Sequence, residues 1–499
     1  MTTIPTAEVS YGRRLTEIAA ERPDDVDLVV VDREGHERPV TWRELETRAN
    51  QIARALQDRG VGKDAIVALA LPSCAEHVFV TVAIWKLGAT LLPLRHDLPA
   101  WEMDRMLALA EPAVLVSDQH RATCPVLTRD DLAATTALPA DPLSDAVSEC
   151  VNLVASSGST GFPKLIVTPA RGVVGGDSQQ GSTKSEGPMR VLVLSPLYHV
   201  NGFAFGAPAM LEGGYVVILE KFDAARAVEL IERHRITFTV MVPTMLQRIA
   251  RLPDLDPARF ASLERVVYGG ARVPDWVVER WLELVDPAVF VFTYGSSERV
   301  GLVMMTGEEW PDHRGAVGRP VDCELSIRDE SGAPLPPEEI GEIYMRPTEP
   351  RRLFEYIGVP TPEPTPDGFY TVGDVGWLDE DGYLYVTDRR TDMIVSGGAN
   401  VFPAEVENAL SEHPAVVDQV VVGVPDEEWG QRVHAVLQVS DPAHPPSDDE
   451  LRAFCKERLA AYKVPKTFEI VDRVPRTEAG KLNRRVLGQE RAANQAGEI

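Results

Sequence analysis

Short apolar runs alternate with amphipathic segments along most of the chain, and the runs have the length of buried β-strands. The amphipathic segments between them have the pattern of helices that cover a sheet. This alternation predicts an α/β fold. The runs predicted as strands are residues 66–71, 191–194, 215–219, 238–242, 266–268 and 289–294.

One helix is marked clearly at its start. Thr41 and Glu44 have the spacing of an N-terminal capping box, and apolar residues then repeat at helical spacing up to Leu56. We therefore expect a helix that begins after Thr41 and ends before Gly60.

The pattern changes in the last quarter of the chain. The segment 360–367, PTPEPTPD, cannot support a helix or a central strand and is predicted to be a connector. A small α/β unit follows, with a helix opening at Pro403 and strands over 420–424 and 432–439. The polar segment after Gly488 is expected to be loose.

A chain of 499 residues is too long for one ordinary core, so two or three domains are expected. We predict a large N-terminal part, residues 1–388, built of several subdomains with layered sheets and helices. We predict a small α/β C-terminal domain over residues 389–499.

Composition narrows the class of protein. Hydrophobic residues make up 44% and charged residues 25%, as in ordinary globular proteins. A net charge of -26 disfavours nucleic acid and anionic lipid surfaces as partners. The five scattered cysteines indicate neither a disulfide framework nor a zinc site. With no export signal or membrane span visible, a cytoplasmic protein is expected.

The most informative stretch runs from Ser156 to Lys164. Hydroxyl groups and glycines around one lysine offer donors and a cation without bulky side chains, as a polyphosphate site requires. GxxxxGK[ST] is absent, so this is not a Walker loop, and a flexible linker is the alternative. The candidate anion-binding residues are Ser156, Ser157, Gly158, Ser159, Thr160, Gly161 and Lys164.

Several segments, in order, resemble motifs of the adenylate-forming superfamily of acyl-CoA synthetases, nonribosomal-peptide adenylation domains and beetle luciferases. Besides 156–164, they are GGA at 269–271, YGSSE at 294–298, YTVGD at 370–374, DRRTD at 388–392 and PRTEAGK at 475–481. The segment 388–409 most resembles the branch with bile-acid and other polycyclic or terpenoid acid CoA ligases. The resemblance implies a large adenylating core, residues 1–388, and a mobile C-terminal domain.

The resemblance also implies roles for single residues. Glu298, a hard oxygen ligand, would bind Mg²⁺ together with Thr160. Asp374 would accept the ribose hydroxyls of ATP. Lys481 would draw the substrate carboxylate and the α-phosphate together, and Lys164 would stabilise pyrophosphate. Further nucleotide contacts would come from Gly269, Gly270, Ala271, Tyr294, Gly295, Ser296, Ser297 and Arg389.

The implied reaction has two steps. A carboxylate attacks the α-phosphorus of ATP and expels pyrophosphate, and the acyl group then passes to a thiol, coenzyme A being preferred. Between the steps the C-terminal domain would rotate about Thr391. This rotation would exchange Lys481 for the loop containing Gly397 and Gly398, whose missing Cβ atoms would let a pantetheine arm approach.

The acid itself is less constrained. His199 lies where the family has an aromatic or histidine gate beside the acyl pocket. No aspartate lies within residues 195–205, where amino-acid-activating relatives carry one, so an amino acid is disfavoured. An apolar acid, including bulky polycyclic or terpenoid acids, suits the candidate pocket residues Phe203, Phe205, Met241 and Gly301.

Three functions stay open at this point. The chain could be a CoA ligase, an enzyme that loads a carrier-protein phosphopantetheine, or a non-catalytic nucleotide-binding relative. The last would be expected to lack Lys481 or Glu298, and both are present. A homo-oligomer is compatible with the sequence.

Overall fold

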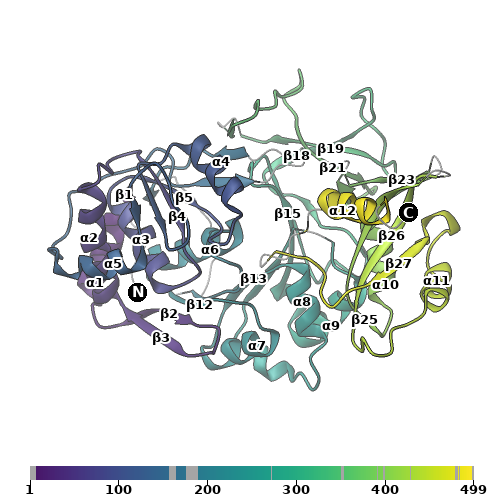
Figure 1. Ribbon diagram of the computed structural model, residues 1–499, viewed down its shortest axis with the longest axis horizontal. Helices are drawn as coiled ribbons and strands as arrows, with labels where there is room; N and C mark the ends of the chain where they lie inside the picture. The colour runs from purple at the N-terminus through teal and green to yellow at the C-terminus, as the bar shows by residue number, and fades with distance from the viewer. Residues whose placement is uncertain are drawn as a thin grey trace.

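The computed structural model describes residues 7–156, 164–175, 189–270, 272–349, 353–389, 392–396, 399–426, 429–477, 482 and 484–496. It shows the expected α/β architecture, with helices packed on several sheets (Figure 1). The helices are α1 Tyr11–Glu21, α2 Trp42–Gln57, α3 Ala75–Lys86, α4 Ala100–Ala110, α5 Arg129–Ala134, α6 Val200–Leu211, α7 Ala224–Arg233, α8 Pro243–Ala250, α9 Asp275–Leu284, α10 Pro403–Ser411, α11 Asp448–Lys456 and α12 Arg484–Ala496.

The largest sheet has the order β17-β16-β15-β14-β13-β11-β12-β2-β3, and its strands from β15 to β2 run parallel. All six predicted strand runs are confirmed; the first of them, 66–71, is β4 of a second, smaller sheet. The strands of the largest sheet are β2 Val26–Val31, β3 Glu37–Thr41, β11 Arg190–Val193, β12 Tyr215–Leu219, β13 Phe238–Met241, β14 Arg265–Tyr268, β15 Phe290–Gly295, β16 Leu302–Thr306 and β17 Arg319–Pro320.

Alternate residues of the parallel strands bury opposite faces of this sheet. Val191 and Val193 pack into a cluster with α1, α2, α3 and α6, whereas Leu192 and Leu194 pack into one with α7, α8 and α9. A strand buried on both faces has no polar side to present, which explains its continuous apolar run.

Four smaller sheets complete the N-terminal part, one of them the two-stranded β1–β10 pair. Of the others, one is parallel, with order β5-β4-β6-β7, another joins β20, β9 and β8, and a third is antiparallel, with order β18-β19-β21-β22. Their strands, with the short β1–β10 pair, are β1 Val9–Ser10, β4 Ile66–Ala70, β5 Thr90–Pro93, β6 Val114–Ser117, β7 Val126–Leu127, β8 Leu153–Ser156, β9 Lys164–Val167, β10 Val173–Val174, β18 Cys323–Arg328, β19 Gly341–Pro347, β20 Glu355–Ile357, β21 Tyr370–Leu378 and β22 Leu384–Arg389.

The C-terminal unit, yellow-green in Figure 1, has its own sheet and core. The predicted helix at Pro403 is α10, and the two predicted strands lie in β25 and β26. Its strands are β23 Ile394–Ser396, β24 Ala399–Val401, β25 Val416–Asp426, β26 Gly430–Val439 and β27 Thr467–Ile470. The boundary between 388 and 389 remains a prediction.

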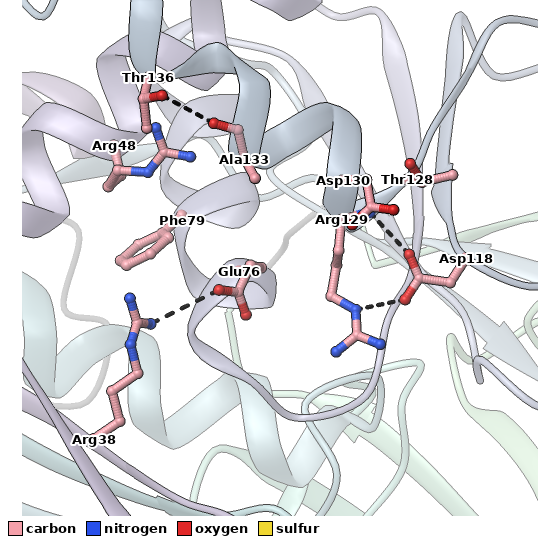
Figure 2. A pocket seen from close by; sticks show the side chains of 10 residues that line it. All are labelled: Arg38, Arg48, Glu76, Phe79, Asp118, Thr128, Arg129, Asp130, Ala133 and Thr136. Carbon is pink, nitrogen blue, oxygen red and sulfur yellow. Dashed lines mark hydrogen bonds and ion pairs between the residues drawn. The ribbon is translucent and has the colours of Figure 1, made fainter.

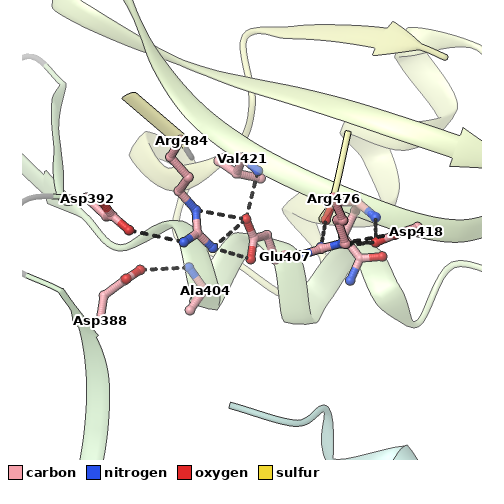
Figure 3. Close-up of polar contacts among 9 residues, drawn as sticks. Asp388, Asp392, Ala404, Glu407, Asp418, Val421, Arg476 and Arg484 are labelled. Atoms are coloured by element: carbon pink, nitrogen blue, oxygen red, sulfur yellow. Dashed lines mark hydrogen bonds and ion pairs between the residues drawn. The ribbon is translucent and has the colours of Figure 1, made fainter. Parts of the chain in front are cut away.

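The expectation of a loose tail after Gly488 is wrong for residues 489–496, the part of the tail that the structure describes. Helix α12 continues to Ala496, because two arginines tie it to the C-terminal unit. Arg484 donates to the Glu407 carboxylate at 2.8 Å and to Asp392 at 3.2 Å (Figure 3), and Arg491 donates to Glu469 at 2.8 Å. The polar residue Arg491 therefore serves charge pairing with the C-terminal unit.

The predicted capping box is only half formed. The Thr41 hydroxyl accepts a hydrogen bond from the Glu44 N–H at 3.2 Å, and α2 begins where expected. The Glu44 carboxylate, however, accepts from Arg38 at 2.9 Å. An arginine on the neighbouring strand competes for the carboxylate, which a local motif does not reveal.

The C-terminal unit contacts the N-terminal part at α8. The guanidinium of Arg251 donates to the carbonyl oxygen of Ser411, at the end of α10, at 3.2 Å, and also to that of Val417. A helix C-terminus carries unpaired carbonyls and favours a cation. None of the described helices is long and apolar enough to cross a membrane.

A buried carboxyl in β2 makes stability depend on pH. Asp27 is 1% exposed, and neither of its carboxyl oxygens has a hydrogen-bond partner. Burial raises its pKa to about 8. The folded state therefore keeps a proton that the unfolded chain loses above about pH 4, so stability falls as pH rises from 4 to 8.

Asp27→Asn is expected to remove this slope and to raise the free energy of unfolding at pH 8 by about 2–4 kcal/mol. Thermal unfolding at pH 5 and pH 8 would measure the change. Asp25→Asn, at an exposed neighbouring position, is the control. A variant whose pH slope equals that of the unmodified protein would contradict the assignment.

Candidate active site

The loops that follow the parallel strands of the largest sheet carry several predicted site residues. His199 follows β11, Gly269 and Gly270 follow β14, and Glu298 follows β15. Carboxyl ends of parallel strands open on one edge of a sheet, where α/β proteins bind ligands. Motifs that are separated in the sequence therefore lie along the same edge of the sheet.

Glu298 and Lys164 meet at this edge although 134 residues separate them. The Lys164 ammonium lies 3.3 Å from Oε1 of Glu298, and the pair is largely shielded from solvent. Tyr356 of β20 joins them: its hydroxyl donates to the same Oε1 at 2.7 Å, and the ammonium lies 3.5 Å from its ring centroid. A carboxylate, a cation and a phenol therefore form one cluster.

Strand pairing explains how this cluster assembles. In the β8–β9 pair, Ser156 lies opposite Lys164, and β20 adds to the other side of β9 with Tyr356 opposite Ile166. Ile166 packs into a hydrophobic cluster shared by β16, β18, β19 and β22. Three sheets thus converge beneath the site.

The charges of the cluster favour an ionised carboxylate. Burial raises the pKa of Glu298, but the Tyr356 hydrogen bond and the Lys164 charge outweigh it, so the pKa lies below its ordinary value. Burial, together with the neighbouring carboxylate, raises the pKa of Tyr356, which keeps the phenol protonated. A buried, ionised carboxylate can ligate a divalent cation, and the ammonium beside it can pair with phosphate oxygens.

A second polar pair lies next to this cluster. Tyr294, at the end of β15, donates its hydroxyl to Oδ2 of Asp374 at 2.8 Å. Asp374 is 9% exposed and lies within β21, next to Gly373, whose φ of 84° lies in the left-handed region. Asp374 is therefore no turn residue, and a buried carboxylate that accepts hydroxyl hydrogens is suited to a ribose.

The geometry of the turn after β14 explains why glycine occupies positions 269 and 270. A Cβ on Gly269 would lie 2.7 Å from Oγ1 of Thr293, on the neighbouring strand. Gly270 has a φ of 97° and open space around its Cα. Backbone can therefore come close to a flat ligand at this turn.

The loop between Gly295 and Glu298 is compact. A Cβ on Gly295 would lie 3.2 Å from the Gly301 carbonyl oxygen, and Ser296 and Ser297 are partly buried in the turn before Glu298. The short loop fixes the carboxylate relative to β15.

The candidate substrate residues whose surroundings the structure describes lie in the core and at the start of α6. Phe205 packs on Phe238 with ring centroids 5.4 Å apart, Met241 is fully buried in the core, and Gly301 faces Cys323. His199 is the N-cap residue of α6, at the edge where the site lies. These four positions remain predictions as substrate contacts.

Several predicted residues fall outside the described part of the chain. They are Ser157, Gly158, Ser159, Thr160, Gly161, Ala271, Thr391, Gly397, Gly398 and Lys481, with the side chains of Phe203 and Arg389.

A separate hollow of 740 Å³ lies in the N-terminal region (Figure 2). Four of its charged side chains form ion pairs: Arg38 lies 3.9 Å from Glu76, and Arg129 pairs with Asp118. No predicted site residue lines it, so it adds nothing to the site above.

The sequence did not reveal Tyr356. It lies in the three-residue strand β20, and the pairing of β20 with β9 brings it to Glu298. A tyrosine in a three-residue strand carries no local signal of this contact.

Two family models match the sequence. The model described as AMP-binding enzyme matches residues 15–349, and the model described as AMP-binding enzyme C-terminal domain matches residues 405–481. The first contains Lys164 and Glu298, and the second ends at Lys481.

Known proteins are similar over nearly the whole chain. A feruloyl-CoA synthase from an Amycolatopsis species is 34% identical, with 89% of this chain and 92% of that protein covered. A fatty acid–[acyl-carrier-protein] ligase, ScoC, from Streptomyces coeruleorubidus is 33% identical, with 90% and 91% covered. The solved o-succinylbenzoate CoA synthetase of Bacillus subtilis with its acyl-adenylate intermediate has a TM-score of 0.78 and 27% identity, with 96% and 98% covered.

Proposed function

We propose that this chain, which belongs to the AMP-binding enzyme family of adenylate-forming ligases, activates an apolar carboxylic acid with ATP and transfers the acyl group to coenzyme A. The observation that carries the proposal is the Lys164–Tyr356–Glu298 cluster beside the Tyr294–Asp374 pair. The cluster offers groups for phosphates and a divalent cation, and the pair offers a ribose acceptor.

In the first step, a carboxylate oxygen of the acid forms a bond to the α-phosphorus of ATP. The bond from this phosphorus to the bridging oxygen breaks, and pyrophosphate leaves with its electrons. Lys164 is placed to move from Glu298 to a phosphate oxygen. No protein nucleophile is required.

The metal of this reaction would be Mg²⁺, and the residues present suit it. Glu298 is 8% exposed, ionised and an oxygen donor, with Thr160 as a second candidate ligand. When bound, the ion would neutralise phosphate charge. Glu298 would hold it, and Tyr356 would keep the carboxylate oriented once Lys164 has moved to a phosphate oxygen.

In the second step, the thiol sulfur forms a bond to the acyl carbon, AMP leaves, and the thiol proton passes to solvent or a base. Coenzyme A is proposed because the named products of two of the three similar proteins are CoA thioesters. A carrier-protein phosphopantetheine is the alternative, since ScoC is named for that acceptor.

The proposed acid is apolar, with an aromatic, fatty or polycyclic body. The named relatives are a feruloyl-CoA synthase, a fatty acid ligase and an o-succinylbenzoate CoA synthetase, none of which is named for an amino acid. Residues 195–205 contain no carboxylate that could pair with an α-amine. Bulky polycyclic and terpenoid acids are also proposed as substrates, because residues 388–409 resemble the branch of polycyclic and terpenoid acid CoA ligases.

The test is a pyrophosphate-release screen over fatty, aromatic, amino and polycyclic acids, each without an acceptor, with CoA, and with a phosphopantetheinylated carrier protein. We expect release with at least one apolar acid and formation of its CoA thioester. Pyrophosphate release with acyl transfer only to a phosphopantetheinylated carrier protein would show that the carrier protein, and not CoA, is the acceptor. ATP binding without pyrophosphate release from any acid would favour a non-catalytic nucleotide-binding protein.

A further inference from the structure

We propose that Tyr356 is a positioning residue for nucleotide binding: its hydroxyl fixes the Glu298 carboxylate, and its ring holds the Lys164 ammonium. This inference rests on the proposed function of the same site and adds a residue to it. Tyr356 lies 58 residues from Glu298 in the chain.

The contacts of Tyr356 are directional. Its hydroxyl donates to Oε1 of Glu298 at 2.7 Å, and the Lys164 ammonium approaches this same oxygen at 3.3 Å. With both contacts on Oε1, the carboxylate cannot turn without breaking them. Oε2 would then be the oxygen presented to a cation.

The ring acts on the lysine independently of the hydroxyl. The Lys164 ammonium lies 3.5 Å from the ring centroid, within the range of a cation–π contact. An aromatic face attracts the ammonium without supplying a full negative charge. The lysine is therefore held next to the carboxylate yet can transfer to a phosphate oxygen.

The fold also holds Tyr356 itself in place. Its N–H donates to Oγ1 of Thr361 at 2.8 Å, and its ring packs on Phe354 with centroids 5.1 Å apart. Strand β20 pairs with β9, which begins at Lys164. One short strand therefore fixes the tyrosine relative to the lysine.

Tyr356→Phe removes the hydroxyl and keeps the ring. We expect the affinity for ATP in the presence of Mg²⁺, measured by calorimetry without any acid, to fall about tenfold, as for other groups that orient a metal ligand. The affinity for ATP in EDTA should stay unchanged, as should the KM for the acid. Equal affinities of the variant and the unmodified protein with Mg²⁺ would overturn the role of the hydroxyl.

Tyr356→Leu removes the ring as well. Here the affinity for metal-free ATP is also expected to fall, by about threefold, because the ammonium loses its aromatic contact. An unchanged affinity in EDTA would overturn the role of the ring.

A matched control exists elsewhere in the fold. Tyr383 donates its hydroxyl to Oε1 of Glu309 at 2.9 Å, and neither residue is among the candidate site residues. Tyr383→Phe should leave both ATP affinities unchanged, and an equal fall in this variant would show a general structural effect instead. Failure of the unmodified protein to release pyrophosphate would refute the proposed function, whereas the binding measurements test Tyr356 separately.

Discussion

Glu298→Gln is expected to lower the rate of acyl-adenylate formation by about 100-fold or more, while the protein stays folded. Glutamine keeps the shape of the side chain and can still accept the Tyr356 hydrogen bond. It lacks the negative charge that would bind a divalent cation and that now attracts Lys164. The loss should therefore fall on catalysis and on binding of ATP with Mg²⁺.

Pyrophosphate release and thermal unfolding, measured together, would check this prediction. Glu309→Gln is the matched control, since Glu309 also accepts a tyrosine hydroxyl and also has a lowered pKa, despite partial burial, through its hydrogen bonds to Thr306 and Tyr383. A control variant that loses as much activity as Glu298→Gln would refute a specific role for Glu298. So would full activity of Glu298→Gln at limiting Mg²⁺.

Lys481→Ala is expected to reduce adenylate formation by about 100-fold or more, and to leave thioester formation from a supplied acyl-adenylate largely intact. The reason is electrostatic. The substrate carboxylate and the α-phosphate repel each other as they approach, and a cation between them lowers this cost only in the first step.

The two half-reactions should be measured separately, with ATP and acid in one assay and synthetic acyl-adenylate and CoA in the other. Lys456→Ala, an exposed lysine of α11 in the same C-terminal unit, is the control. Equal loss of both half-reactions in Lys481→Ala would contradict the assigned role. Lys481 lies outside the described residues, so its role rests on the PRTEAGK motif and not on an observed contact.

Much of the fold was predictable because its signals are local. A buried parallel strand has to be apolar on both faces, so β11 and β13 were visible as apolar runs. Helix α10 begins at Pro403, as the proline predicted. By contrast, α12 was missed, because its stability comes from Arg484 and Arg491 reaching acidic groups on other segments.

The candidate site also contains residues that the sequence predicted and residues that it did not. Glu298, Asp374 and Lys164 could be named from motifs, since each lies in a short segment of distinctive composition. Tyr356 could not, and neither could the burial of Asp27, because both depend on neighbours far away in the chain.

The sequence by itself determined the α/β class, the family and the order of the motifs, because hydrophobic periodicity and motif composition are properties of contiguous residues. Only the tertiary structure decided that Lys164 and Tyr356 both contact the same oxygen atom, Oε1 of the Glu298 carboxylate. The register of β20 on β9 and the short loop after β15 set this contact. Strand register is fixed by packing across sheets, so no local pattern in the sequence contains it.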